Sequence, residues 1–428
     1  MKTANQLILI IIIILYNNIS WADGYLNGQI TFFDTRVNTD NNSYLATSLR
    51  NTNKAVKELL IYIYDRDGSC IDFEDTCNEN DDDLLTQGYT NTSGNYNLYV
   101  STSSEDIYLM TEYENVYGTM FNPDYTQRQI NSGIIQENFS GTKTKNWNIT
   151  CNYSSNGECS LLLISNSYYS QYYQENEPFA DILASLYDMA SFMDDEGVLN
   201  INNLTFNNGE EFHIHYPNDV EDHCDGMTDG GKSWDWGSIC IAENTFDENH
   251  IVAHEGGHNL QRRALYTTNL NGGCPSPHGW NVNAGNDKCP IVEGWAEFVA
   301  AAVYWPAEAE DAWLRNATRT LEGNTTNGNS SSMSCVSQNS NPDNVDGNVA
   351  RWFWDLYDSV NVDETSTEDG ENQTFNYITT IWDSFPAGTA NRQNNENGAD
   401  GRNAYDYKYY YTNSSTELTK NCLSSQAQ

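Results

Sequence analysis

The order of apolar and polar positions changes near residue 148, from short alternating runs to longer runs with helical spacing. Before that point, runs rich in β-branched and aromatic residues occur at 59–65, 95–101 and 106–114, separated by clusters of Gly, Asn, Asp and Ser. Such runs with turn residues between them are typical of the strands of a small β-sandwich. We therefore predict a β-sandwich-like domain over residues 23–148, which serves as an accessory domain or a pro-domain.

The second part of the chain combines predicted helices with two predicted strands. Apolar residues recur at helical spacing in three runs, residues 178–193, 290–304 and 349–360. Pro178 can begin the first of these helices, because proline is well tolerated in a first helical turn. Residues 210–217 and 238–246 are short runs with strand character. The chain as a whole is therefore expected to be α+β, with its second domain over residues 149–428.

The first 22 residues have the features of a signal peptide. Lys2 supplies a positive charge, residues 7–15 form an apolar run, and Ser20–Ala22 places small residues at a cleavage position. The apolar run is too short for a comfortable membrane span, although an uncleaved anchor is the alternative. We see no other long apolar run and no C-terminal anchor signal, so we expect a secreted protein without a membrane partner after signal removal.

The cysteines and glycosylation tripeptides agree with an extracellular location. The chain has 10 Cys, and an oxidising compartment favours their pairing. Proximity in the sequence suggests Cys70–Cys77, Cys151–Cys159, Cys224–Cys240 and Cys274–Cys289, which leaves Cys335 and Cys422 as the remaining pair. Asn-x-Ser/Thr tripeptides occur from Asn41 to Asn413. The protein is therefore expected to be a disulfide-bonded glycoprotein.

The net charge of the chain limits the classes of partner that we expect it to bind. Acidic residues number 60 and basic residues 20, for a formal net charge of −40. Such a polyanion is repelled by nucleic acids and by anionic membranes, so neither is expected as a partner. The 28 Tyr and 11 Trp argue against a chain that is disordered throughout.

An acidic segment, residues 65–83, has two interpretations. Its clustered carboxylates are ligands that Ca²⁺ prefers, so a calcium loop is one of them. It lacks the full alternating pattern and the terminal Glu of a helix–loop–helix calcium site. The interpretation that we favour is a solvated acidic loop closed by Cys70 and Cys77.

The strongest chemical signal is the segment His-Glu-Gly-Gly-His at residues 254–258. Thr245 and Glu248 have the spacing of a capping box, so a helix can begin just before it. On a helix, His254 and His258 lie one turn apart on one face, as two ligands of a tetrahedral zinc ion require. Glu255 is rotated from them by about 100° and can reach a zinc-bound water as a general base.

The two glycines between these histidines also require an explanation. Each of Gly256 and Gly257 costs about 1 kcal/mol in a helix interior relative to alanine. We therefore expect close approach at this turn, either by a neighbouring helix or strand or by the backbone of a substrate. The alternative is that tertiary packing simply outweighs this cost.

A catalytic zinc ion needs a third protein ligand and one open position. The layout with a third His six residues after the second does not apply, because Gln261 and Ala264 stand where Gly and His are required. A later predicted helix instead supplies two carboxylates four residues apart, Glu293 and Glu297. Glu293 is the ligand that we favour, and Glu297 and His278 are its rivals.

These motifs resemble those of the gluzincin metallopeptidases. The chain pairs His-Glu-Gly-Gly-His with Glu-Gly-Trp-Ala-Glu-Phe at 293–298, and the likeness extends from about residue 244 to 358. The resemblance implies a zincin-like domain in which Glu293 is the third zinc ligand. It also implies that Glu297 accepts a hydrogen bond from His254, which orients that ring. The longer segment between His258 and Glu293 departs from the shortest spacings of the family.

A developing oxyanion needs a donor from His, Tyr or Arg in addition to the metal. The candidates for this role or for substrate contact are His278, Arg351 and Tyr304, with His223 as a further one. For each of them a structural role is at least as good an interpretation.

Three functions fit these residues. The first is a secreted zinc metallopeptidase that hydrolyses peptide bonds through a zinc-bound water activated by Glu255. The second is another zinc hydrolase, acting on an ester or a non-peptide amide with the same residues. The third is a catalytically inert binding glycoprotein. Because the two histidines, the base and both later carboxylates are all present, we favour the first, with peptides or proteins as substrates and Zn²⁺ as cofactor.

Overall fold

The computed structural model of the chain describes residues 24–34, 36, 52–65, 83–101, 106–121, 130–136, 141–150, 171–198, 212–217, 230–233, 237–243, 248–264, 288–307, 309, 313–314, 319–321, 346–357, 374–376 and 378–379. The expected signal peptide and nearly all of the acidic segment lie outside these residues. The two described ends of that segment are joined, since the Asp83 amide donates to Asp65 Oδ1 at 2.7 Å.

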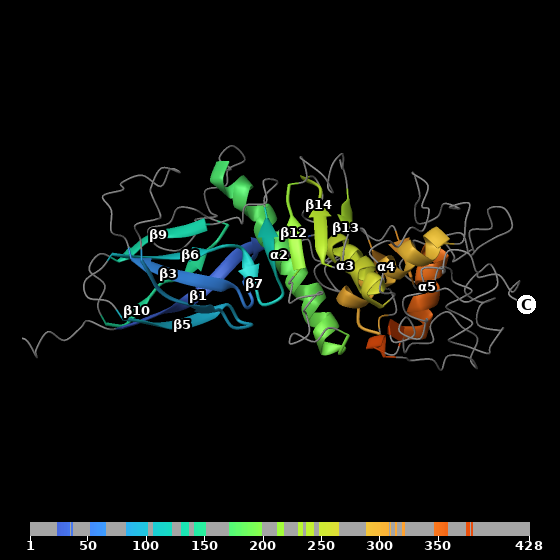
Figure 1. Ribbon diagram of the computed structural model, residues 1–428, viewed down its shortest axis with the longest axis horizontal. Coiled ribbons are helices and arrows are strands. Elements are labelled where there is room, and N and C mark those ends of the chain that lie inside the picture. Colours follow the sequence, from blue (N-terminus) through green and yellow to red (C-terminus); the bar gives the residue numbers. More distant parts are fainter. Residues whose placement is uncertain are drawn as a thin grey trace, which may run out of the picture. The chain divides into compact units, whose positions relative to one another are not determined.

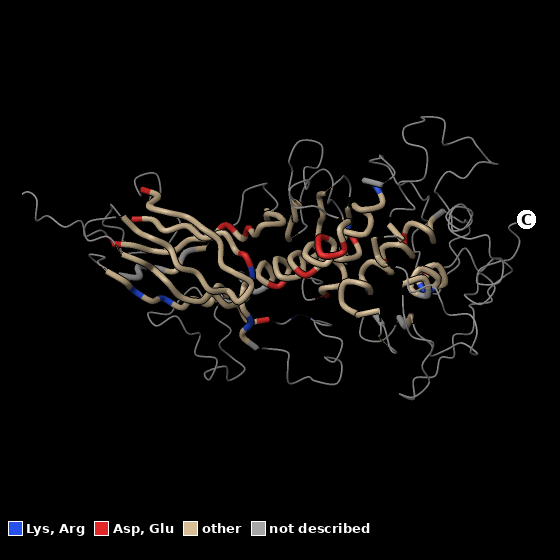
Figure 2. The backbone as a smooth tube through the Cα atoms, turned by 90° about the horizontal axis from the view of Figure 1, so that it is seen from below, with Lys and Arg blue, Asp and Glu red and all other residues tan. Residues whose placement is uncertain are grey.

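The chain divides into two compact units that interleave along the sequence (Figure 1). Unit 1 comprises residues 1–33, 53–116 and 128–180. Unit 2 comprises residues 34–52, 117–127 and 181–428. Asp and Glu positions occur in both units (Figure 2).

The described residues of unit 1 form two sheets. The strands of these sheets are β1 (Gly24–Asp34), β2 (Thr52–Ala55), β3 (Leu60–Asp65), β4 (Leu84–Tyr89), β5 (Asn95–Val100), β6 (Ile107–Thr111), β9 (Ile130–Gln136), β10 (Lys143–Thr144) and β11 (Trp147–Asn148). One sheet has β1 at its centre, antiparallel to β5 and parallel to β10 and β11. The other is antiparallel throughout, in the order β4-β3-β6-β9.

Alternation along the strands explains how these sheets form a core. In β3, Ile61 and Ile63 are fully buried while Tyr62 between them is half-buried. Leu26 of the β1 sheet and Leu109 of the β3 sheet are also fully buried. Each sheet thus has an apolar face of the kind that period-two alternation produces. The strand predictions at 59–65, 95–101 and 106–114 are confirmed by β3, β5 and β6.

The described residues of unit 2 form four helices and the strands of two sheets. Its strands are β8 (Gly118–Phe121), β12 (Phe212–His215), β13 (Gly231–Ser233), β14 (Ser238–Ile241), β15 (Trp313–Leu314) and β16 (Arg319–Thr320). Its helices are α3 (Asn249–Ala264), α4 (Lys288–Tyr304), α5 (Asp346–Tyr357) and the part of α2 (Gln171–Asp195) that follows Ala180. One sheet has the strand order β13-β14-β12-β8-β7, in which β7 is Glu114–Asn115. In it, β13 is antiparallel to β14, and β14, β12 and β8 run parallel. Strands β15 and β16 form a separate antiparallel pair.

Helices α3, α4 and α5 follow strands β14 and β13 in chain order (Figure 1). Helix α3 packs against β13 and β14 on one side and against α4 on the other, and α4 packs against α5. Aromatic rings fill the α4–α5 contact: the Trp295 ring centroid lies 5.1 Å from that of Phe353, and the Phe298 ring stacks on Phe353 at 5.5 Å. These contacts pack α5 against α4, the helix that also contacts α3.

The predicted helices of this part are all present, with one correction. The run at 178–193 lies in α2, but this helix starts at Gln171, so Pro178 is inside it and does not begin it. An interior proline loses one backbone hydrogen bond and its ring crowds the carbonyl of residue i−4, at a cost of about 3 kcal/mol, and the helix continues through Pro178 despite this local cost. The predicted capping residue Thr245 lies outside the described residues. Among the helices of the described part, none combines the length and the apolar character that crossing a membrane requires.

Candidate metal centre

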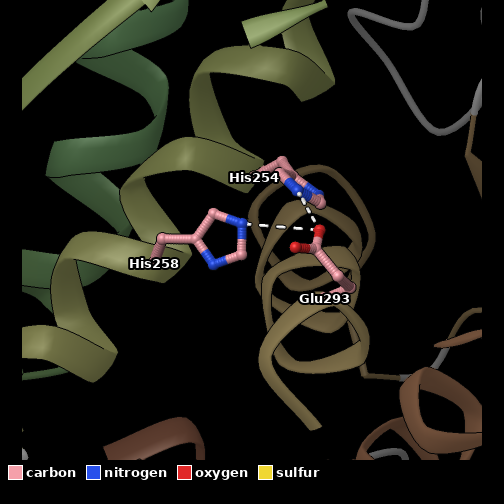
Figure 3. A group of neighbouring side chains, drawn as sticks. All are labelled: His254, His258 and Glu293. Atoms are coloured by element: carbon pink, nitrogen blue, oxygen red, sulfur yellow. Dashed lines mark ion pairs between the residues drawn. The ribbon is translucent and has the colours of Figure 1, made fainter. Parts of the chain in front are cut away.

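Helix α3 presents the two histidines of the motif on one face, as the spacing predicts. The imidazole rings of His254 and His258 lie edge to face, with centroids 4.8 Å apart. Both rings point toward Glu293 on α4 (Figure 3). The two helices therefore bring together three residues, of which the first, His254, and the last, Glu293, are 39 positions apart in the sequence.

The glycines beside the histidines are sites of close helix packing. A methyl group on Gly257 would lie 2.9 Å from Cα of Ala296 on α4, and one on Gly256 would overlap the sulfur of Met189 on α2. The indole of Trp295 donates a hydrogen bond to the Gly257 carbonyl oxygen at 3.0 Å. The expectation that a neighbouring helix approaches this turn is confirmed, and the approach brings the carboxylates of α4 within reach of α3.

The three side chains converge on a common point. Oε2 of Glu293 lies 3.4 Å from Nε2 of His254 and 3.6 Å from Nε2 of His258. One potential ligand atom from each residue lies within 4.8 Å of those from the other two. His258 is buried, and the side chains of His254 and Glu293 are about one-seventh exposed (15% and 14%), so the point they surround is reachable from solvent. The distances exceed good hydrogen bonds, so the arrangement resembles a ligand set more than a self-contained network.

The electrostatics of Glu293 suit a metal ligand. Burial alone would raise the pKa of its carboxyl, but the neighbouring imidazoles of His258 and His254 lower that pKa well below its ordinary value. The group is therefore an ionised carboxylate at neutral pH. Two imidazole nitrogens and one carboxylate oxygen are the donor types that zinc takes in catalytic sites with three protein ligands, so the residues present fit such an ion.

The other two glutamates of the motifs lie beside this cluster. Oε1 of Glu297 is 3.9 Å from Nδ1 of His254, on the side of the ring away from Glu293. Glu255 is buried, at 5% exposed, and lies on the face of α3 that meets β13. A methyl group on Gly231 of β13 would lie 2.8 Å from Cγ of Glu255 and 3.0 Å from its Oε1. The strand thus packs directly on this side chain.

The remaining candidates from the sequence are placed as follows. The hydroxyl of Tyr304 donates to the Asn249 carbonyl oxygen at 3.1 Å, at the first residue of α3. Arg351 is buried on α5, and its Nη1 is 3.4 Å from Oδ1 of Asn348. His278 and His223 lie outside the described residues. A role in substrate or oxyanion contact stays a prediction for all four.

Sequence reasoning did not identify Arg262, which is buried one turn after Asn259 on α3. Its guanidinium donates from Nη1 to Oγ of Ser233 at 2.6 Å and from Nη2 to the Ser233 carbonyl oxygen at 2.9 Å. Helical spacing is the feature of the sequence that could have pointed to Arg262, because it lies seven residues after Glu255 and therefore on the same face of the helix. The position of β13 could not be read from its three residues.

The cysteines add one structural fact. Cys240 and Cys289, which lie in β14 and α4, are both disulfide-bonded. Which cysteines pair stays a prediction.

A family model matches the part of the chain that carries this cluster. The mycolysin C-terminal domain model matches residues 205–416, which contain α3, α4 and α5. The match indicates that this segment is similar to a domain of a secreted peptidase family. It covers the two histidines and both carboxylates of the candidate centre.

Comparisons with whole proteins add no functional argument. No curated protein matches the chain. One solved structure that matches is a 9R-lipoxygenase from Cyanothece PCC8801, with 15% identity and a TM-score of 0.16. The match covers 41% of this chain and 25% of the lipoxygenase chain. This TM-score is too low to support a shared fold.

Proposed function

We propose that the chain is a secreted, gluzincin-type zinc metallopeptidase. The observation that carries the proposal is the convergence of Nε2 of His254 and Nε2 of His258 on one oxygen of Glu293, at 3.4 and 3.6 Å, with Glu255 next to the first histidine. The similarity of residues 205–416 to a peptidase-family domain supports it independently.

In this proposal, His254, His258 and Glu293 are the protein ligands of Zn²⁺, and Glu297 orients His254. When bound, the zinc ion supplies Lewis-acid polarisation of the scissile carbonyl and lowers the pKa of water. Glu293 is favoured over Glu297 as third ligand because its oxygen faces both Nε2 atoms, whereas Glu297 faces Nδ1 of His254. A carboxylate at Nδ1 fixes the tautomer that leaves Nε2 free to bind a metal.

Glu255 acts as the general base. It takes a proton from the attacking water and passes it to the nitrogen of the leaving amine, so that the peptide bond breaks to a carboxylic acid and an amine. Its burial against β13 limits the conformations of the carboxylate. That restriction favours a fixed distance between the base and the reacting water.

The test is hydrolysis of a mixed library of quenched fluorescent peptides by the purified secreted chain. We expect cleavage that chelator abolishes and that added Zn²⁺ restores. Esterase substrates are measured in parallel, and hydrolysis of esters without peptides would assign the centre to the alternative class of zinc hydrolase. A chain that cleaves no substrate and binds no zinc would instead support the inert binding glycoprotein.

A further inference from the structure

The face of α3 next to the histidines forms a continuous contact with β13. Glu255, Asn259 and Arg262 are spaced at i, i+4 and i+7, so they lie along one stripe of the helix. At one end of this stripe, Gly231 packs on Glu255, where a methyl group would be 2.8 Å from Cγ. At the other end, Arg262 bonds to Ser233, the last residue of the same strand.

The bonds from Arg262 are well made and buried. Nη1 and Nη2 engage the hydroxyl and the carbonyl oxygen of Ser233 at 2.6 and 2.9 Å, and Nη1 is also 3.1 Å from Oδ1 of Asn259. Arg262 and Ser233 are 8% and 7% exposed, so water competes little for these bonds. Hydrogen bonds from a charged donor are about twice as strong as neutral ones.

Strand β13 depends on such an anchor. It has three residues and, within the described part of the sheet, pairs only with β14. Its ladder is therefore short, and a terminal strand of this length is held weakly by backbone bonds alone. Gly231 is two residues from Ser233, so movement of the anchored end is transmitted directly to the contact with Glu255.

We infer that Arg262 is a positioning residue for Glu255: it fastens β13 to α3, and the backbone at Gly231 then confines the carboxylate of the base. This inference rests on the proposed function, in which Glu255 is the general base. We expect changes at Arg262 to lower turnover and to leave metal binding unchanged. Arg262 lies on the face of α3 that contacts β13, not on the face that carries His254 and His258.

The first experiment tests whether Arg262 anchors β13, and it does not depend on a catalytic assay. Deuterium uptake of the segment that contains β13 is compared between the wild type, Arg262→Lys and Arg262→Met, each loaded with zinc. We expect exchange in β13 to rise by at least about tenfold in Arg262→Met, with α4 unchanged. The lysine variant keeps the charge but has no planar fork for both Ser233 atoms, so its rise is expected to be smaller. Unchanged exchange in both variants would overturn the anchoring role.

The second experiment measures kcat, KM and zinc affinity of the same variants and of Gly231→Ala. We expect kcat to fall by about tenfold or more in Arg262→Met and in Gly231→Ala, with KM and zinc affinity within about twofold of the wild type. Because both changes act through one strand, the double variant is expected to lose less than the product of the single losses.

Arg36→Lys is the matched control, since Arg36 is as deeply buried in unit 2 but bonds to Asp34 and Asp188 and not to β13. It is expected to lower stability and leave kcat per folded molecule unchanged. If Arg262 variants lose activity only in proportion to zinc content or folded fraction, as a structural role predicts, the inference is wrong. A zinc-loaded wild type that hydrolyses no peptide contradicts the proposed function itself, which the wild-type measurement shows before any variant is compared.

Discussion

Two of the buried clusters of charged side chains in the described part of unit 2 differ in whether their donors and acceptors pair with one another. In the first, which we call the arginine cluster, Arg36 contacts Asp34 at 3.1 Å and Asp188 at 2.9 Å. In the second, the candidate metal centre, two imidazoles face a single oxygen of Glu293 at 3.4 and 3.6 Å. Both are largely removed from water, yet they differ in how donors and acceptors are matched.

The arginine cluster has the geometry of a compensated ion pair. Nε and Nη2 of Arg36 donate to the two carboxylate oxygens of Asp34, and Nη1 donates to Asp188 and to Ser185. Burial alone would lower the pKa of Arg36, but the carboxylates of Asp34 and Asp188 raise it well above its ordinary value. Each of the three guanidinium nitrogens thus donates to an acceptor within the cluster, as in a self-contained structural ion pair.

The candidate metal centre has the opposite character. Its three residues each offer an atom that can donate an electron pair to a cation, and these atoms lie within 4.8 Å of one another. The comparison teaches that burial and charge alone do not distinguish a site from a structural network. What distinguishes them is whether the lone pairs converge.

The largest expected effect is on catalysis. Glu255→Gln keeps the shape of the base but removes its ability to accept a proton, so we expect kcat to fall by about 10²–10⁴-fold. Zinc content, measured by atomic absorption, should remain that of the wild type. Glu196→Gln, at a glutamate that follows α2, is the control and should retain full activity. Equal activity of Glu255→Gln and wild type would show that another group is the base.

The arginine cluster should instead affect stability. Arg36→Met removes the guanidinium that neutralises the buried Asp34 carboxylate, which keeps only the backbone N–H of residue 36 from this pair. We expect the free energy of unfolding to fall by about 3–5 kcal/mol. Urea denaturation followed by tryptophan fluorescence measures this change, and zinc affinity of the folded variant should be unaffected. A loss of less than about 1 kcal/mol would mean that the cluster is not the compensated pair that its distances indicate.

The two carboxylates of α4 should differ in their effect on metal affinity. Glu297→Gln removes the negative charge near Nδ1 of His254, and we expect zinc affinity to fall by about 10–100-fold. Glu293→Gln removes a ligand, so its loss should exceed that of Glu297→Gln. Competition with a chromogenic chelator measures both affinities. A larger loss for Glu297→Gln would exchange the roles of the two residues.

The smallest expected effect concerns the packing behind the site. In Gly257→Ala, the added methyl group would be 2.9 Å from Cα of Ala296, which is main chain that cannot rotate away. Overpacking costs about 1–3 kcal/mol, and the better helix propensity of alanine returns about 1 kcal/mol of that. We therefore expect a net loss of up to about 2 kcal/mol in urea denaturation. A stabilised variant would show that α3 and α4 can separate freely.

Much of the centre could be predicted because its signals are local. His254 and His258 are fixed by helical spacing alone, and Glu293 lies in a second helix whose apolar pattern is strong. The cost of glycine in a helix also predicts close packing at Gly256 and Gly257. The residues that pack there, Met189 and Ala296, could not be predicted, because they lie on other helices.

What sequence reasoning missed depends on contacts between distant segments. Strand β13 has three residues and no alternation to detect, so neither its pairing with β14 nor its contact with Glu255 has a sequence signal. The interaction of Arg262 with Ser233 spans 29 residues and became visible only with the fold. The sequence predicts the start of α2 too late, because proline is typical of a first helical turn and Pro178 here lies inside the helix.

The measurement that tests the central claim most directly is an anomalous difference map at the zinc edge, from crystals of the zinc-loaded protein. The account predicts one strong peak bounded by Nε2 of His254, Nε2 of His258 and the carboxylate of Glu293, at about 2.0–2.2 Å from each of them. A zinc-loaded protein whose peak lies elsewhere, or whose map shows none at these three side chains, would contradict it.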